Sequence, residues 1–344
     1  MRLFVSEFVC SGAWAQESLD SSLLAEGRSM LLAVLRDATR IQGLDVVTIW
    51  SGQRERFPVE GVAFQVAHSP EEEIELLAEL AALSDVTLLI APEFDGILTH
   101  RALLVEGVGG RLCGPSPLAI TTCTDKLELA GHLQGAGLPT IPTSEFSVTH
   151  DTSATVTYPC VIKPRDGAGS QATYLVESAT DFERLLPGWK QSSLLRQAIW
   201  QPYISGRAVS VGVMVTPEQY RYQPLPPCEQ TLSTDGRFAY QGGVLPARGV
   251  DAVTLQHAAV AACREVPGLR GYVGVDLIIP DSHPGQPIVV EINPRITTSY
   301  LGYSRLCEQN LIATLLQADS DAGELTWNPV QLEYFATGEV RRTV

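Results

Sequence analysis

The 344-residue sequence lacks the features that mark secreted, membrane or nucleic-acid-binding proteins. Its seven cysteines are scattered, odd in number and without a CxxC pair, which is typical of a reduced, cytoplasmic chain. No apolar run approaches the roughly 20 residues of a membrane-spanning helix, and Glu7 interrupts the first run before it reaches signal-peptide length. The formal net charge of -15 argues against a nucleic-acid partner, because phosphate backbones are bound by clustered Lys and Arg. We therefore expect neither membrane nor nucleic acid as a partner.

The first part of the chain, residues 1–115, alternates short apolar runs with helical patterns. The runs are LFVSEFV, DVVTIW and VTLLIAP, and the helices are expected over residues 23–42 and 71–83. This alternation predicts an α/β domain with a parallel sheet covered on both faces. Open sheets of this kind bind ligands beyond the carboxyl ends of their strands, and the loop after VTLLIAP carries Glu93 and Asp95.

The segment GPSP, residues 114–117, marks a domain boundary, because Pro and Gly punctuate the chain before a helix opens at TTCTDKLELAGHLQ. Residues 116–205 then contain short strands such as PCVIKP and ATYLV, which predict a small antiparallel lobe. Residues 206–344 mix strands with helices near 253–265 and 300–317, which predicts a larger α+β lobe. The expected fold class is therefore α/β followed by two α+β lobes.

The segment VVEINPR, residues 289–295, carries the pattern of a metal site. In an extended strand alternate residues share a face, so Glu291 and Asn293 project together. The turn DSHPGQ folds GYVGVDLIIP back against this strand as a hairpin, which brings Asp276 beside them. An all-oxygen set of this kind suits Mg²⁺ or Mn²⁺ together with substrate phosphates. The alternative is a surface hairpin whose acids are solvated.

Candidate residues for phosphate binding lie upstream of the metal strand in the sequence. Lys163 ends an apolar strand, and the following loop over residues 166–171 contains Gly167 and Gly169, which let backbone N–H groups approach phosphate oxygens. Lys126, at the start of the TDKLEL helix, is a second candidate for phosphate binding. The alternatives are an ordinary hairpin turn and an ordinary solvated lysine. Neither a Walker A loop nor a complete GxGxxG motif is present in the sequence.

In this order and spacing, Lys126, Lys163, the glycine-containing loop, the segment QPYISG, Asp276 and EINPR resemble the ATP-grasp superfamily over about residues 115–316. The resemblance implies two α+β lobes that clasp ATP and an N-terminal pre-ATP-grasp domain that helps to bind substrate. It also implies the cofactors ATP and Mg²⁺ or Mn²⁺. The implied metal ligands are Asp276, Glu291 and Asn293.

The same resemblance implies a set of nucleotide contacts. Lys126 and Lys163 would meet the α- and β-phosphates. The remaining contacts would come from the glycine-containing loop over the β- and γ-phosphates and from the hinge beside adenine: Gly167, Gly169, Ser170, Gln201, Pro202, Tyr203 and Ile204. Two positions depart from the family pattern. Gln201 replaces the Glu that often begins the hinge, and Ala208 stands where an acid commonly binds the ribose hydroxyls, which puts the strength of ATP binding in doubt.

The implied chemistry is the activation of a carboxylate as an acylphosphate, followed by attack of an amine to give an amide. This reaction needs in-line positioning and charge neutralisation. Arg295 is the first candidate to stabilise the leaving phosphate and the oxyanion, and Arg248, after the segment GVLPAR, is the second. Small-molecule acid and amine substrates are therefore the expected partners, and a homodimer is the candidate assembly, with the oligomeric state left open.

Within the superfamily, MRLFVSEFVCSG and EINPRITTSYLGY are most similar to the tyramine–glutamate ligases of methanofuran biosynthesis. This similarity implies L-glutamate as the acid and tyramine or a related amine as the acceptor. The alternatives are a D-alanine ligase-like or carbamoyl phosphate synthetase-like enzyme and a non-catalytic nucleotide-binding module.

Further substrate contacts are expected from residues outside the phosphate site. Thr297, Thr298 and Ser299 follow the metal strand at the substrate end of the cleft, although Ser299 is equally a candidate helix N-cap. Glu7 and Ser11 are candidates for recognising a substrate amine or carboxylate, with a solvated strand residue as the alternative for Glu7.

Overall fold

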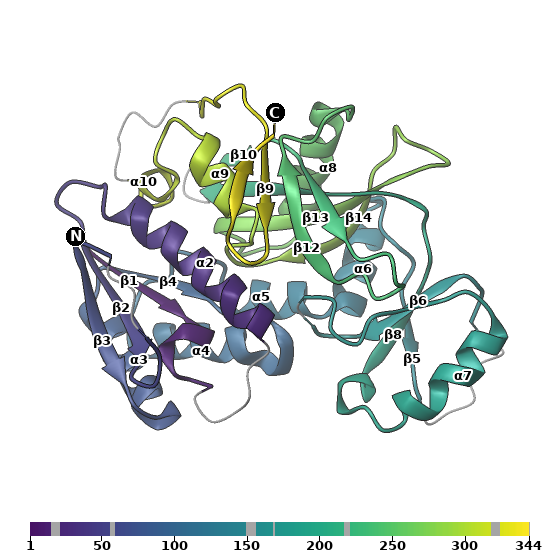
Figure 1. Cartoon of the computed structure of the whole chain (residues 1–344), viewed down its shortest axis with the longest axis horizontal. Helices are drawn as coiled ribbons and strands as arrows, with labels where there is room; N and C mark the ends of the chain where they lie inside the picture. The colour runs from purple at the N-terminus through teal and green to yellow at the C-terminus, as the bar shows by residue number, and fades with distance from the viewer. Residues whose placement is uncertain are drawn as a thin grey trace.

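The structure is a computed structural model that describes residues 1–14, 21–55, 59–148, 156–167, 169–216, 221–317 and 324–343. Three sheets divide it into an N-terminal domain, a small lobe and a large lobe (Figure 1). In Figure 1 the N-terminal domain is purple to blue, the small lobe is teal, and the large lobe runs from green to yellow. Parallel sheet is confined to the N-terminal domain and antiparallel sheets build both lobes, as the sequence predicts.

The N-terminal domain has a four-stranded parallel sheet in the order β3-β2-β1-β4. Its elements in chain order are β1 (Arg2–Glu7), α1 (Phe8–Ser11), α2 (Ser21–Ala38), β2 (Asp45–Ser51), β3 (Val62–Ala67), α3 (Pro70–Leu83), β4 (Val86–Ile90), η1 (Phe94–Gly96) and α4 (Ile97–Gly107). Strand β3 has no counterpart among the strands expected from the sequence. It is an edge strand with mostly exposed or half-buried residues, so it lacks a continuous apolar run.

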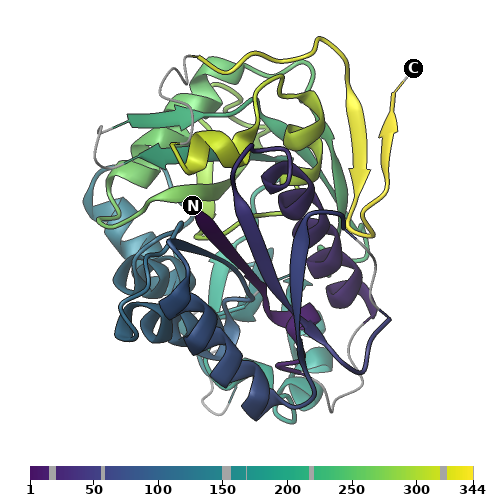
Figure 2. The ribbon, with the colours of Figure 1, turned by 90° about the vertical axis from the view of Figure 1, so that its left-hand side faces the viewer.

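Helices cover both faces of this sheet because successive strand residues point to opposite sides. Leu3 and Val5 of β1 pack in a core with α2, whereas Phe4 packs in a second core with α3 and α4. Figure 2 shows α2 and the α3–α4 pair on opposite sides of the strands. The carboxyl ends of β1 and β4 therefore meet at one edge, from which the loop carrying Glu93 emerges.

Two short helices link the N-terminal domain to the lobes, α5 (Pro117–Thr124) and α6 (Lys126–Gly135). The sequence predicts one helix here, but Asp125 breaks it, because its side chain caps α6 by accepting from the N–H groups of Leu127 and Glu128. Leu129 and Leu133 of α6 pack in the core of the large lobe. The domain boundary predicted near residue 115 assigns this helix to the small lobe, whereas in the structure it packs with the large lobe.

The small lobe is an antiparallel sheet in the order β5-β8-β6-β7. Its elements are β5 (Ser144–Phe146), β6 (Cys160–Pro164), β7 (Tyr174–Val176), α7 (Ala179–Trp189), η2 (Ser193–Leu195) and β8 (Ala198–Pro202). Phe146 and Phe182 meet Trp189 edge-on, with ring centroids 6.0 and 5.6 Å apart. This aromatic cluster gives the small lobe a hydrophobic core of its own.

The large lobe is an antiparallel sheet in the order β14-β13-β9-β11-β12-β15-β16, with β10 paired to β9. Its elements are β9 (Gly206–Thr216), β10 (Arg221–Pro224), β11 (Cys228–Leu232), β12 (Tyr240–Leu245), α8 (Ala252–Arg264), β13 (Gly271–Pro280), β14 (Ile288–Asn293), α9 (Tyr300–Leu306), α10 (Leu311–Leu315), β15 (Leu332–Phe335) and β16 (Val340–Arg342). The sequence predicts a single helix over residues 300–317, but the structure has two helices there. Asn310 is the N-cap of the second helix, because its side chain accepts from the N–H groups of Ile312 and Ala313.

The N-terminal domain and the large lobe share one hydrophobic core. Helix α2 packs against α9, and apolar residues of both parts belong to the same buried cluster. The Tyr300 hydroxyl donates to the Asp37 carboxylate at 2.7 Å, and the Asn310 amide donates to the Asp37 carbonyl at 2.6 Å. These two parts therefore form one body, against which the small lobe stands with its separate core. No helix within the described ranges is both long and apolar enough to cross a bilayer.

A buried ion pair offers a test of this N-terminal packing. Glu73 of α3 and Arg101 of α4 are almost fully buried, and Arg101 also donates to Ser6 at 3.2 Å. Glu73→Ala should lower the free energy of unfolding by about 3 kcal/mol, because it leaves a buried charge unpaired. Glu106→Ala, which breaks the half-exposed pair with Arg270, should cost less than about 1 kcal/mol. Urea unfolding measures both, and equal losses would contradict the described burial.

Candidate active site

A pocket of about 280 Å³ lies between the small lobe and the large lobe. Its walls come from both lobes, together with Lys126 of α6 and Glu26 of α2. It gathers nearly every residue that the sequence singled out for nucleotide, metal or catalysis: Lys126, Lys163, Gly167, Gly169, Ser170, Gln201, Pro202, Tyr203, Ile204, Asp276, Glu291, Asn293 and Arg295. Segments up to 169 residues apart in the sequence thus converge on one cleft.

The predicted metal strand has the expected geometry. Strands β13 and β14 pair antiparallel with Asp276 directly opposite Glu291, and a bulge follows Asp276. The Asp276 carboxylate accepts a hydrogen bond from the Asn293 amide at 3.0 Å and another from the Gln230 amide at 3.0 Å. Gln230 lies on β11 and is absent from the sequence-based set, because nothing in its own segment marks it as part of a site.

The two carboxyl groups interact strongly. Burial, followed by the charge of Glu291, raises the pKa of Asp276 well above its usual range. Burial alone would also raise the pKa of Glu291, but Lys126 and Lys163 outweigh it and lower this pKa. The pair therefore holds two oxygen-rich groups side by side at a site where a cation would relieve their repulsion.

This donor set fits a magnesium or manganese ion. Asp276, Glu291 and Asn293 offer only oxygen ligands, and Mg²⁺ uses one or two carboxylates and completes its shell with phosphates and water. Across the part of the chain that the structure describes, no group of three or more His, Cys, Asp or Glu side chains is placed to hold a metal. The two acids and the amide alone are thus a partial shell, which suits a metal that arrives with a phosphate ligand.

Besides Arg295, the positive charge of the pocket comes from Lys126 and Lys163, two of the three lysines in the whole chain. The Lys126 ammonium donates to the Gly167 carbonyl at 2.9 Å and lies 3.6 Å from Glu291. Lys163 is 9% exposed, and burial lowers its pKa to about 8, although Glu291 opposes the shift. Lys126 thus pairs directly with Glu291, and both ammonium groups line the same pocket as the two acids.

The glycine-containing loop joins β6 to β7. Gly169 and Ser170 are both left-handed, with φ of 64° and 60°, and Ala168 lies outside the described residues. Nothing lies within 4 Å of a Cβ added at Gly169, so its backbone is open to the cleft. The loop is longer than a tight hairpin turn, and consecutive N–H groups in such a loop can bind an anion.

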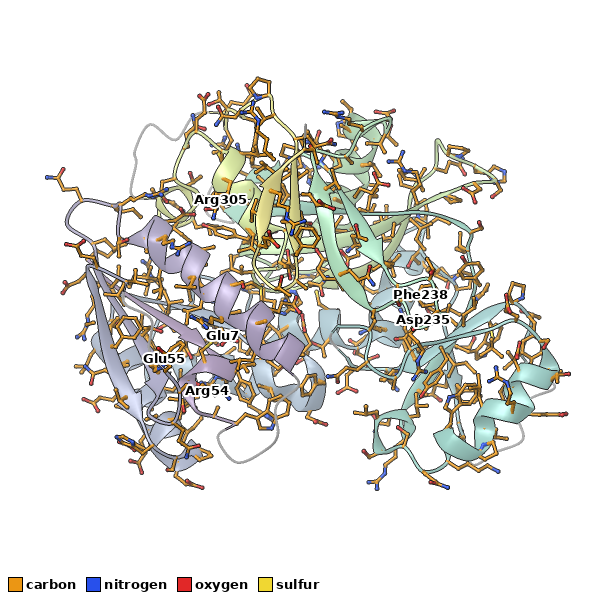
Figure 3. The ribbon with its side chains drawn as sticks, in the orientation of Figure 1. Glu7, Arg54, Glu55, Asp235, Phe238 and Arg305 are labelled. Atoms are coloured by element: carbon orange, nitrogen blue, oxygen red, sulfur yellow. The ribbon has the colours of Figure 1, made fainter. Side chains whose placement is uncertain are left out.

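Two aromatic side chains line the hinge end of the pocket. Tyr203 of the hinge stacks on Phe238 with centroids 6.1 Å apart and planes at 27°. Phe238 lies in the turn between β11 and β12, where Figure 3 shows it with Asp235 at the junction of the two lobes. The same turn reaches β7, because the Leu175 N–H donates to the Gly236 carbonyl at 2.8 Å. Phe238 was not predicted as a site residue, because the sequence predicts a strand that begins at this position, whereas β12 begins at Tyr240.

Gln201 is almost fully buried at the hinge end of the pocket. Its amide donates to the Thr143 hydroxyl at 2.8 Å, which fixes its orientation. Ala208 also lines the pocket and brings no acid there. Both departures from the family pattern therefore occur inside the cleft itself.

Arg295 enters the pocket from the end of the metal strand. Its NH2 group donates to Glu93 at 3.0 Å, its Nε lies 2.8 Å from the same carboxylate, and its NH1 donates to the Ile296 carbonyl at 3.1 Å. Burial alone would lower the pKa of Arg295, but Glu93, Glu26 and Glu291 outweigh it. Glu93, which the sequence marked only as part of a loop, thus comes directly to the site.

The residues after the metal strand lie at the same end as Arg295. Thr298 donates to the Glu26 carboxylate, and Ser299 contacts Thr297 at 2.8 Å and the Tyr272 hydroxyl at 3.1 Å. Ser299 occupies the N-cap position of α9, but its side chain makes no capping hydrogen bond. Its hydroxyl therefore belongs to the polar network beside the pocket.

Arg248, Glu7 and Ser11 are not among the residues that line this pocket. Strand β12 begins at the cleft with Tyr240, and Arg248 follows its far end, where its carbonyl accepts from Arg207. Glu7 is buried and accepts from the N–H groups of Val9 and Cys10, so it is neither solvated nor at the pocket. Ser11 donates to the Phe8 carbonyl. The structure therefore does not support these three residues as site residues.

The buried lysine provides a direct test of the site. Dimethylation with ¹³C-formaldehyde labels every lysine for NMR, and Lys163→Arg assigns one signal. The Lys163 signal should titrate near pH 8, because burial disfavours its charged form. A Lys163 midpoint above 10 would show that the amine is solvated, contrary to the described pocket.

Known proteins are similar to this chain in sequence and in fold. A model of the ATP-grasp domain matches residues 123–299, and a model of the pre ATP-grasp 3 domain matches residues 46–120. The tyramine–L-glutamate ligase of Methanocaldococcus fervens is 27% identical over 243 residues, which are 71% of this chain and 68% of the relative. The D-alanine–D-alanine ligase of Leptospira biflexa is 29% identical over 197 residues, 52% of this chain and only 55% of that relative.

Solved structures agree with the sequence relatives. An ATP-grasp superfamily protein from Archaeoglobus fulgidus has a TM-score of 0.70 and 26% identity, with 97% of this chain and 92% of that chain covered. The L-amino acid ligase from Bacillus licheniformis has a TM-score of 0.71 at 17% identity, with coverage of 97% and 79%, and shows likeness of fold alone. Since the domain model spans more than half of its length, this chain belongs to the ATP-grasp family.

Proposed function

We propose that this protein is an ATP-dependent carboxylate–amine ligase that forms ADP, phosphate and an amide through an acylphosphate. The observation that carries the proposal is the convergence of Asp276 and Glu291 with Lys126 and Lys163 in one pocket. Oxygen ligands for a divalent cation and two ammonium groups thus line one pocket that is open to a ligand. Phosphoryl transfer from a nucleotide needs this combination of charges.

The lysines bind and orient the phosphates in this proposal. A phosphate that arrives beside Lys163 favours the charged amine, so the pKa of Lys163 rises when the nucleotide binds. Asp276, Glu291 and Asn293 hold Mg²⁺ or Mn²⁺, which when bound neutralises charge that develops on the transferred phosphoryl group. Gly167, Gly169 and Ser170 lie in the loop that covers the phosphates.

The hinge end of the pocket receives the adenine. Pro202 and Ile204 of the hinge line it with Gln201, and the stacked rings of Tyr203 and Phe238 form one wall. An amide at Gln201 can meet adenine, but Ala208 offers no acid to the ribose. We therefore expect ATP affinity to depend strongly on the phosphates and the metal.

Arg295 is the proposed catalytic cation. It lies beyond the metal ligands, on the side of the pocket where Thr298 and Glu26 meet. A guanidinium at this place stabilises the phosphate that leaves and the oxyanion that forms when the amine attacks. Chemistry of this kind needs no covalent nucleophile from the protein.

The proposed substrates are L-glutamate and tyramine or a related amine. The similarity to the M. fervens tyramine–L-glutamate ligase supports this choice, since it extends over two thirds of each chain. A D-alanine ligase-like acid is the alternative, supported by relatives that match over 52% of this chain. A place in methanofuran biosynthesis follows only from the tyramine–glutamate assignment.

Phosphate release from ATP with glutamate and a panel of amines tests the reaction. We expect release that requires Mg²⁺ or Mn²⁺, an acid and an amine. Glu291→Ala should lower turnover by at least about 100-fold, because charge neutralisation at the phosphoryl group is lost. Arg248→Ala is the matched control and should retain wild-type turnover, because Arg248 does not line the pocket.

Unchanged turnover in Glu291→Ala would refute the catalytic proposal. A protein that binds ATP but releases no phosphate with any acid and amine would instead be a non-catalytic nucleotide-binding module. Release with D-alanine but not with glutamate would keep the ligase chemistry and replace the proposed substrates.

A further inference from the structure

The loop after β4 connects the N-terminal domain to the catalytic cleft at two points. Glu93 contacts Arg295 with both of its carboxylate oxygens, and the Asp95 N–H donates to the Asp166 carboxylate in the loop after β6 at 3.0 Å. Asp95 and Gly96 are both left-handed, with φ of 53° and 67°, which gives this loop a sharp turn. One short segment of the N-terminal domain therefore touches both sides of the cleft.

The Glu93–Arg295 pair is buried, which distinguishes it from a surface ion pair. The side chains are only 5% and 12% exposed, so the pair is little screened by water. The Arg295 NH2 group donates to one Glu93 oxygen, Nε lies 2.8 Å from the other oxygen without an aligned hydrogen bond, and NH1 donates to Ile296. Since a guanidinium has five N–H groups, this arrangement orients the plane and leaves donors for a ligand.

Arg295 has competing acidic neighbours. Besides Glu93, with which it forms an ion pair, the acids Glu26 and Glu291 line the same pocket as Arg295. Without Glu93, the guanidinium would be drawn towards Glu26 and Glu291. Movement towards Glu291 would occupy an oxygen that the proposed metal needs.

We propose that Glu93 is the positioning residue of Arg295, which it holds at the reacting end of the cleft and away from the metal ligand Glu291. This role rests on the proposed ligase function, in which Arg295 stabilises the developing negative charge. Glu93 itself does not line the pocket. It makes the N-terminal domain part of the catalytic machinery through a single ion pair.

The first test compares two isosteric variants of buried N-terminal glutamates. Glu93→Gln should lower kcat by about 10- to 100-fold, since small misplacement of a catalytic group has effects of this size. It should also raise the Mn²⁺ concentration needed for half-maximal phosphate release, whereas ATP affinity measured without metal should stay unchanged. Glu73→Gln removes the same charge from the buried pair with Arg101 and should lower Tm while keeping kcat and the Mn²⁺ requirement.

The conservative variant and a double-mutant cycle complete the test. Glu93→Asp keeps the charge and should restore part of the lost kcat. In an Arg295→Ala background, Glu93→Gln should cause no further loss of kcat, because a residue that acts through Arg295 has nothing left to position. Additive losses in the cycle would show that Glu93 acts independently of Arg295 and would overturn the proposal.

Other outcomes are equally decisive. Wild-type kcat in Glu93→Gln would refute the positioning role while leaving the ligase function intact. A Glu93→Gln protein that resembles Glu73→Gln, with lower Tm and unchanged kinetics, would show a structural role only. A wild-type protein without phosphate release would refute the ligase function itself, and the positioning role would fall with it.

Discussion

The pairing of Asp276 with Glu291 across β13 and β14 is the constraint on which the cleft depends. Two partly buried carboxylates side by side are unfavourable unless cations or protons compensate them. The surrounding site supplies that compensation: Lys126 lies 3.6 Å from Glu291, and Gln230 and Asn293 donate to Asp276. A register shift of one residue in β14 would send Glu291 to the other face of the sheet and away from Lys126.

The packing of the three parts sets the small lobe apart from the rest of the structure. The N-terminal domain and the large lobe share a core through α2 and α9, whereas the small lobe has its own. Lys126 lies on α6, which packs with the large lobe, and Lys163 lies on β6 of the small lobe. A phosphate chain bound by both lysines would therefore tie the small lobe to the main body. The Gly236–Leu175 hydrogen bond already joins the lobes at the aromatic end.

Local patterns made much of the site predictable. Alternation in VVEINPR placed Glu291 and Asn293 on one face, and the turn at DSHPGQ brought Asp276 to them, because both are short-range features. Glu93 and Phe238 reach the cleft only through contacts between parts of the fold that no motif records. Arg248 does not line the pocket, and the sequence did not tell which end of β12 meets it. Asp125 broke an expected helix because its capping role depends on side-chain hydrogen bonds.

The central claim is that one cleft holds a divalent cation at Asp276 and Glu291 while Lys126 and Lys163 hold nucleotide phosphates. A crystal structure with Mn²⁺ and a non-hydrolysable ATP analogue tests this most directly, because Mn²⁺ gives an anomalous signal. The account predicts an anomalous peak within coordination distance of Asp276, Glu291 and Asn293, with the phosphates between the two lysines. A peak elsewhere, or phosphates that contact neither lysine, would contradict it.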